Sequence, residues 1–137
     1  MTRRLAKNPR KRRKKKCRYQ RGTYVSPLAG ECKYRSGWEL KYMQYLDSNP
    51  SVRSWSYEKL IIEYVSNKST GKIRKYYPDF LIEMHDNTRL VVEIKQKRKL
   101  DSLIVKKKIH AAEQWCSFNK ATFLILTELE LKDMGLL

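Results

Sequence analysis

The sequence predicts an α/β fold in which helices flank a mixed β-sheet, preceded by a disordered basic arm. Four observations support this prediction. Apolar, β-branched stretches alternate with two stretches of helical periodicity, and a strand–helix–strand order near the C-terminus favours a right-handed crossover between parallel strands. The positive charge is concentrated at the N-terminus, and 137 residues suffice for one core. We therefore divide the chain into an arm, residues 1–21, and a domain, residues 22–137.

The arm holds 12 of the 31 Lys and Arg residues and no Asp or Glu. Such a segment repels itself and stays unfolded in isolation. On a phosphate backbone it would release counterions and give affinity without sequence choice, for DNA and RNA alike. A solubility tail and a targeting signal are the alternatives. The cationic residues predicted to contact DNA are Arg10, Lys11, Arg12, Arg13, Lys14, Lys15, Lys16 and Arg18.

The formal charge of +17 favours a polyanionic partner, of which nucleic acid is the common case and an anionic membrane surface the other. We expect no membrane span, since no run of about 18 apolar residues occurs. The charged N-terminus lacks the apolar region of a secretory signal. The three cysteines form no CxxC pair, which is typical of free thiols in a reducing compartment.

The first part of the domain reads as an irregular segment, 22–34, followed by a helix over 35–50. Ser36 is a suitable N-cap, and Glu39 three residues later would complete a capping box. The sequence Asp-Ser-Asn-Pro ends the helix. Its predicted buried stripe consists of Trp38, Tyr42, Tyr45 and Leu46.

The middle of the domain reads as β-structure. A long strand over 52–66 is rich in aromatic and β-branched residues, and 73–84 is its expected hairpin partner. Residues 85–88 turn the chain. The next strand, 89–96, has the apolar content of a central position in a sheet.

The last part reads as a helix over 101–119 and an apolar strand over 121–127, parallel to the strand before the helix. Thr127 and Glu130 form a second candidate capping box, which opens a short helix ending near Gly135. The apolar face of the long helix comprises Val105, Ile109, Ala112 and Cys116, widened by Ile104, Ala111 and Trp115.

Three charged residues interrupt the predicted buried strands. Asp79 follows Pro78, and Glu93 and Lys95 share one face of the strand 89–96. If the two strands are neighbours, the three side chains converge, and two adjacent carboxylates suit a hard cation such as Mg²⁺. Lys95 would then orient a water or neutralise charge on a phosphate. The alternatives are a turn aspartate and an exposed cross-strand pair.

The strings YRSGWELKYMQYLD, VRSWSYE, YYPDF and VEIK occur in this order. Together they resemble the PD-(D/E)xK nuclease superfamily, and within it the tailed-phage head-completion nucleases and the catalytic domain of TnsA-type transposon endonucleases. The resemblance implies a restriction-endonuclease-like core and hydrolysis of DNA with Mg²⁺, or with Mn²⁺ in its place. It also implies Asp79, Glu93 and the Ile94 carbonyl as metal ligands, Lys95 as the catalytic lysine, and Glu39 as the acidic residue of the first helix.

Two departures bear on the assignment. TnsA-type proteins carry Gln where Glu93 stands and have a further C-terminal domain, whereas head-completion nucleases often have Pro where Gln96 stands. The first departure favours a phage-type nuclease, acting in the bacterial host cytoplasm or in the virion, with head or portal proteins as partners. The alternatives are a TnsA-like transposase subunit and a non-catalytic, basic DNA-binding structural protein. Glu39 as a helix cap rather than a metal ligand and a dimeric state also stay open.

Overall fold

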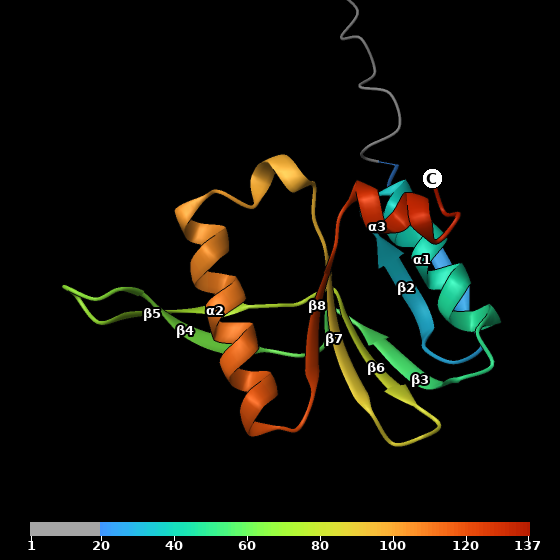
Figure 1. Ribbon diagram of the computed structural model, residues 1–137, viewed down its shortest axis with the longest axis horizontal. Coiled ribbons are helices and arrows are strands. Elements are labelled where there is room, and N and C mark those ends of the chain that lie inside the picture. Colours follow the sequence, from blue (N-terminus) through green and yellow to red (C-terminus); the bar gives the residue numbers. More distant parts are fainter. Residues whose placement is uncertain (1–19) are drawn as a thin grey trace, which may run out of the picture.

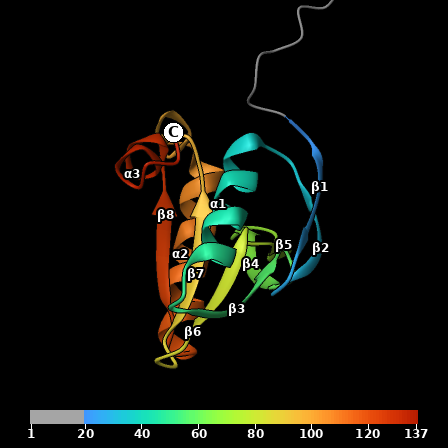
Figure 2. The same cartoon turned by 90° about the vertical axis from the view of Figure 1, so that its right-hand side faces the viewer.

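The structure, a computed structural model, describes residues 20–137, so the predicted cationic residues of the arm lie outside the described part. A mixed sheet forms the centre, with helices on its two faces (Figures 1 and 2). The predicted α/β class is confirmed. The elements are β1 (Gly22–Ser26), β2 (Gly30–Tyr34), α1 (Gly37–Ser48), β3 (Val52–Tyr57), β4 (Ile62–Asn67), β5 (Lys72–Tyr76), β6 (Phe80–Met84), β7 (Arg89–Ile94), the 3₁₀-helix η1 (Lys97–Lys99), α2 (Leu103–Phe118), β8 (Thr122–Leu126) and α3 (Glu128–Asp133).

The central sheet has the strand order β3-β6-β7-β8. Strand β6 runs antiparallel to β3 and β7, whereas β8 runs parallel to β7. Helix α2 makes the crossover from β7 to β8, and β7 is an interior strand. Both predictions for this region, the parallel neighbour and the central strand, are confirmed.

The two faces of the sheet carry separate cores. On one face, Met43 and Leu46 of α1 are buried together with Phe80 and Val92. On the other face, Ala111 and Ala112 of α2 pack against the region of Ile62 and Tyr76. The alternation of side chains along β7 divides its residues between these cores, so that Glu93 has the parity of Val91 and not of Val92.

Helix α2 departs from its predicted apolar face in one place. Ala111, Ala112 and Cys116 are buried as expected, but Ile104 is 62% exposed. Periodicity identifies which face of a helix is apolar but not how much of that face packs against the sheet. The first turn of α2 borders a groove beside β4 and β5 instead of covering the sheet.

Residues 22–34 form an antiparallel hairpin, β1–β2, where the sequence indicated an irregular segment. Ser26 Oγ accepts hydrogen bonds from the backbone N–H groups of Leu28 (3.1 Å) and Ala29 (3.0 Å). Gly30 closes the turn with a φ of 75°, which glycine adopts without strain. The strands are only five residues long, too short for the alternation to stand out.

The long hairpin predicted over 52–66 and 73–84 is wrong in its continuity. Each of its strands breaks in two, so β3 pairs with β6 in the central sheet and β4 pairs with β5 in a separate two-stranded sheet. Glu58 has a φ of 53°, a left-handed conformation, and Pro78 has no N–H for a ladder bond. The Glu58 N–H donates to the Asp79 carbonyl (2.9 Å), which links the two breaks. The β4–β5 hairpin therefore projects from the body (Figure 1).

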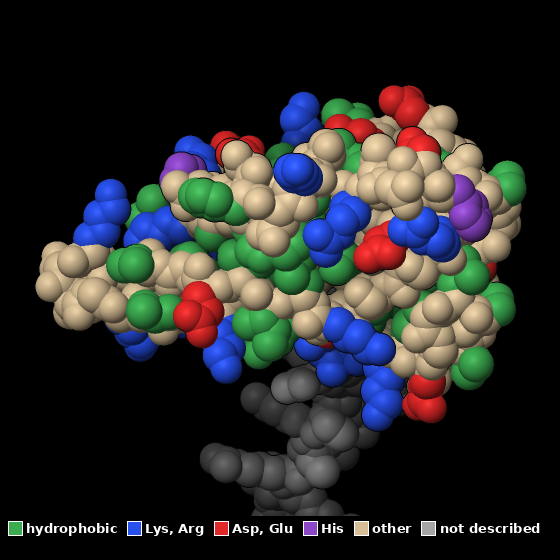
Figure 3. Space-filling model, turned by 90° about the horizontal axis from the view of Figure 1, so that it is seen from below, with side chains coloured by type: hydrophobic (Ala, Val, Ile, Leu, Met, Phe, Trp, Pro, Cys, Tyr) green, Lys and Arg blue, Asp and Glu red, His purple; other side chains and the backbone are tan. Residues whose placement is uncertain are grey.

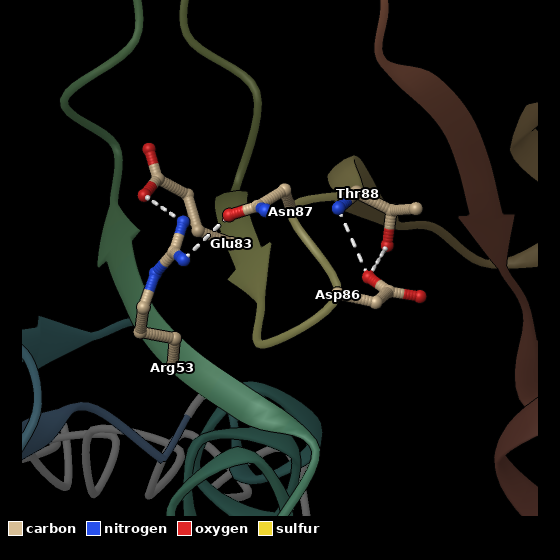
Figure 4. A network of polar contacts seen from close by, with 5 residues as sticks. All are labelled: Arg53, Glu83, Asp86, Asn87 and Thr88. Atoms are coloured by element: carbon tan, nitrogen blue, oxygen red, sulfur yellow. Dashed lines mark hydrogen bonds and ion pairs between the residues drawn. The ribbon is translucent and has the colours of Figure 1, made fainter.

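The turn between β6 and β7 lies at residues 85–88 as predicted. Asp86 Oδ1 accepts from the Thr88 N–H (2.9 Å) and from Thr88 Oγ1 (2.6 Å). Arg53 Nη1 donates to Asn87 Oδ1 (2.8 Å), and Arg53 Nη2 lies 3.3 Å from Glu83 Oε2 (Figure 4). These contacts tie the edge strand β3 to the turn.

The two predicted capping boxes have different outcomes. Thr127 and Glu130 form theirs at the start of α3. Ser36 Oγ accepts from the Glu39 N–H (3.2 Å), but the Glu39 carboxylate accepts from the Arg35 N–H (3.3 Å) and not from Ser36. Glu39 is therefore not a capping-box residue in the strict sense, and its carboxylate has another partner, described below.

In the part of the chain that the structure describes, the helices are all too short or too polar to cross a membrane.

Candidate active site

A cleft of about 510 Å³ opens where the broken hairpin meets the end of β7 and the N-terminal turn of α1. The residues that sequence analysis singled out, Glu39, Asp79, Glu93, Ile94 and Lys95, all line it. They come from α1, the β5–β6 break, β7 and the residue after β7. The rest of the lining comprises Arg35, Glu58, Lys75, Tyr76, Tyr77 and Lys108.

Asp79 and Glu93 are held by reciprocal hydrogen bonds. The Ile94 N–H donates to Asp79 Oδ2 (2.8 Å), while the Asp79 N–H donates to Glu93 Oε2 (3.2 Å). Tyr76 OH donates to the same Glu93 oxygen (2.7 Å). This arrangement requires the strand to break at Pro78, because a continuous β5–β6 strand would use the Asp79 N–H in the ladder.

Each of these carboxylates keeps one oxygen without a hydrogen-bond donor. Glu93 Oε1 lies 3.8 Å from Lys95 Nζ, and Asp79 Oδ1 has no donor among the described residues. Among the described residues, Arg89 Nε is the one side-chain nitrogen or oxygen atom that is fully buried and has no hydrogen-bond partner. Asp79 Oδ1 and Glu93 Oε1 also have no donor, so they are not fully buried and are open to the cleft. Each carboxylate thus has one oxygen fixed by the backbone and the other free for a ligand.

The electrostatics of the cleft are those of crowded acids. Burial raises the pKa of Asp79 well above its usual value, and the Glu93 charge raises it further. Burial also raises the pKa of Glu93, against the opposing effects of the Tyr76 hydrogen bond and the Lys95 charge. The raised pKa values indicate that the surrounding protein groups do not fully neutralise the negative charge of Asp79 and Glu93.

Glu39 approaches the same cleft from α1. Its Oε2 accepts from Tyr57 OH, a close contact, and from the Arg35 N–H. Burial raises the pKa of Glu39, while the Tyr57 hydrogen bond lowers it. The carboxylate is therefore positioned by β3 as well as by its own helix, and it also borders a smaller pocket of about 140 Å³ beside Ile94 and Lys95.

The six other residues that line the cleft have no catalytic or metal-binding role predicted from the sequence. Arg35 Nη2 lies 3.3 Å from Glu58 Oε2 and partly balances that acid. Lys108 Nζ lies 5.7 Å from the centre of the Tyr76 ring and brings a further cation to the cleft, beside Arg35, Lys75 and Lys95. Helical spacing could have identified Lys108, because it precedes the buried Ala111 and Ala112 by three and four residues.

The carboxylates fit a hard divalent cation. Mg²⁺ takes one or two carboxylates and completes its shell with waters and phosphate oxygens. The open oxygens of Asp79 and Glu93, with the Ile94 carbonyl, are donors of that kind, and a cation would offset their repulsion. Among residues 20–137 no three His, Cys, Asp or Glu side chains form a metal site by themselves. The catalytic and metal-binding roles of these residues, Glu39 included, stay predictions.

The sequence of this chain is similar to those of known nucleases. The sequence model of the family described as TnsA-like endonuclease N terminal matches residues 49–128. The head completion nuclease of Enterobacteria phage T4 is 35% identical over 78 residues, which cover 55% of this chain and 51% of that protein. The chain thus spans about half the length of the curated relative that it matches. Because the family match covers more than half of the chain and includes the Pro-Asp and Glu-x-Lys residues, the protein belongs to the TnsA-like endonuclease family within the PD-(D/E)xK nuclease superfamily.

Proposed function

We propose that the protein is a Mg²⁺-dependent DNA endonuclease that hydrolyses phosphodiester bonds, with Mn²⁺ as an alternative cation. The observation that carries this proposal is the pair Asp79 and Glu93, each with one oxygen held by a backbone N–H and one open to the cleft beside Lys95. Such an arrangement holds the open oxygens in place before any ligand binds.

Each residue has a specific role in this proposal. Asp79, Glu93 and the Ile94 carbonyl would hold the cation. When bound, Mg²⁺ lowers the pKa of a coordinated water and offsets negative charge on the phosphodiester. Lys95 stabilises charge that develops on the phosphate oxygens or orients the attacking water. Departure of the 3′ oxygen would leave a 5′-phosphate.

Three further residues position the acids. Tyr76 holds Glu93 Oε2, which turns Oε1 toward Lys95. Tyr57 and the Arg35 N–H hold Glu39 where α1 borders the cleft. From there Glu39 would bind the cation or one of its waters.

We assign the endonuclease to the processing of phage DNA during head completion. The support is the 35% identity over 78 residues to a phage protein that is named a head completion nuclease. Head or portal proteins would be its partners, and the bacterial cytoplasm or the virion its location. The match to TnsA-like endonucleases favours a second candidate, a subunit that cuts only with its transposase partners.

The test is incubation of the purified chain with supercoiled, branched and single-stranded DNA. We expect cleavage with Mg²⁺ or Mn²⁺ and none in EDTA, and none from Asp79→Asn with any cation. Asn retains an oxygen that can accept from the Ile94 N–H, so the fold is kept. Cleavage that persists in EDTA, or equal nicking by the variant, would contradict the proposal. Inactivity of the chain alone would favour the transposase-type subunit or a non-catalytic binding protein.

A further inference from the structure

The charge of the described domain is divided between two regions. Residues 20–137 carry 20 Lys and Arg against 14 Asp and Glu. Two short segments, 68–75 and 95–108, hold 11 of these basic residues and a single acid, Asp101. The rest of the domain holds 9 basic and 13 acidic residues, so outside these segments the domain is acidic.

The two segments lie around the cleft. The first is the turn and strand β5 of the projecting hairpin, and the second runs from the end of β7 through η1 into the first half of α2 (Figure 1). Lys75 from the first segment and Lys95 and Lys108 from the second line the cleft. Lys and Arg side chains surround the projecting hairpin in Figure 3.

A groove of about 310 Å³ continues this surface away from the cleft, between the hairpin and the start of α2. Lys72 and Arg74 of β5 line one wall, and Leu103 and Ile104 line the other. Alternation along β5 places Lys72 and Arg74 on one face of the strand and Lys75 on the other, and Lys75 lines the cleft.

Most of these cations have no acidic partner. Of the eleven, only Lys95 has an ion pair among the described residues, and its partner is Glu93 of the cleft. Lys107 has a structural contact, since its Nζ donates to the Ser66 carbonyl (2.7 Å) and ties α2 to the hairpin. Lys72 and Arg74 are exposed, so the Lys72 ammonium group and the Arg74 guanidinium group are available to an external anion.

We propose that this basic surface, formed by residues 68–75 and 95–108, binds the phosphate backbone of DNA and leads it into the cleft. The inference rests on the proposed function for its substrate but not on the metal. It is distinct from the contribution of the N-terminal arm, because the surface belongs to the folded domain and adjoins the candidate catalytic residues.

The need for such a surface follows from the cleft itself. Glu39, Glu58, Asp79 and Glu93 would repel a phosphodiester that approaches them. Cations within about 8–10 Å, the Debye length near physiological salt, offset this repulsion and raise the local concentration of a polyanion. Lys75, Lys95 and Lys108 line the same cleft as the acids, so a strand held by them would come close to the open oxygens of Asp79 and Glu93.

The test compares two double variants that lose the same charge. Lys72→Gln with Arg74→Gln alters the groove, and Lys33→Gln with Lys41→Gln removes two exposed cations from β2 and α1. Binding of the full chain to a DNA duplex is measured in EDTA over a range of salt concentrations, with an RNA duplex of the same sequence in parallel. Because EDTA prevents metal-dependent cleavage, this measurement is independent of whether the chain is a nuclease.

For DNA, neutralisation of each phosphate contributes about 0.9 to the slope of log K against log salt. We expect the groove variant to lose up to about 1.8 of that slope and about 10-fold or more of its affinity at 0.1 M salt, while the control keeps both. Equal losses from the two variants would overturn the proposal, since binding would then follow net charge alone. Loss of RNA binding with unchanged DNA binding would also overturn it and would indicate an RNA surface.

Discussion

Two groups of partly or fully buried acids in this protein differ in how their oxygens are used. Asp47 on α1 accepts three hydrogen bonds from neutral donors, namely Tyr24 OH, Ser26 Oγ (2.7 Å) and Trp55 Nε1 (2.9 Å). Both of its oxygens are engaged, and the three donors come from β1 and β3. Asp79 and Glu93 each have one engaged oxygen and one open oxygen.

This difference separates a structural acid from a candidate catalytic acid. The hydrogen bond to Asp47 raises the pKa of Tyr24 to about 12, so Tyr24 stays a donor at neutral pH and the group is complete without a ligand. In the cleft, burial raises the pKa values of Asp79 and Glu93, and the Glu93 charge raises that of Asp79 further. Acids held in this way reduce the stability of the free protein, and a cation can recover that free energy on binding.

The largest expected effect is on the cleavage rate, and it distinguishes Asp79 of the cleft from Asp47 of α1. In the proposed mechanism Asp79→Asn removes a charged metal donor, and the loss of several kcal/mol of transition-state stabilisation corresponds to a rate decrease of about 10³-fold or more. Steady-state cleavage of a labelled DNA by equal amounts of folded protein measures it. If Asp47→Ala, assayed below its unfolding temperature, lowers the cleavage rate as much, the distinction between a structural Asp47 and a catalytic Asp79 is wrong.

The next effect separates the groups by stability. Asp47→Ala leaves Tyr24, Ser26 and Trp55 without their acceptor, and each partly buried donor left unpaired costs on the order of 1–3 kcal/mol. Some of these donors regain water, so we expect a net loss of about 2–4 kcal/mol in the free energy of unfolding. Urea unfolding followed by tryptophan fluorescence measures the loss. An unchanged midpoint would show that the Asp47 contacts are not structural.

A smaller effect tests whether Glu39 belongs with the cleft acids. Glu39→Gln retains a carbonyl oxygen for the Tyr57 OH and the Arg35 N–H, so the free energy of unfolding should change by less than about 1 kcal/mol. If Glu39 binds the cation or its water, cleavage should fall by about 10- to 100-fold. Unchanged cleavage would place Glu39 with Asp47, as a residue that only joins α1 to β3.

The central sheet and the helices could be predicted because their signals are local. Residues 89–96 are apolar enough to indicate an interior strand, and the helix that follows, 101–119, has the length of a crossover connection. Thr127 and Glu130 form a capping box within four residues, so no distant part of the chain can alter it.

The strand breaks and the β1–β2 hairpin could not be predicted because they depend on contacts distant in sequence. Residues 52–66 have continuous strand propensity, yet Glu58 adopts a left-handed φ and bonds to Asp79 across 21 positions. This break frees the Asp79 N–H for Glu93, so the error in the predicted strand falls at the candidate site. The sequence predicts that Asp79 lies beside Glu93. It does not reveal the hydrogen bonds that hold them, from the Ile94 N–H to Asp79 and from the Asp79 N–H to Glu93.

The smallest effect concerns the pH dependence of stability without a divalent cation. A carboxyl group with a raised folded pKa binds its proton more tightly in the folded than in the unfolded state, so its contribution to stability falls as pH rises from its ordinary pKa through the raised value. Asp79 and Glu93 should therefore lower the melting temperature of the metal-free protein at pH 7.5 relative to Asp79→Asn, by a few degrees. At pH 4, where the acids are protonated in the folded state, the difference should vanish. The comparison of variants at one pH cancels the repulsion of the basic chain, which itself changes with pH. Addition of Mg²⁺ at pH 7.5 should raise the melting temperature of the wild type more than that of Asp79→Asn, because the proposed site holds the cation between two charged oxygens. A variant that melts below the wild type at pH 7.5 would show that Asp79, like Asp47, stabilises the fold.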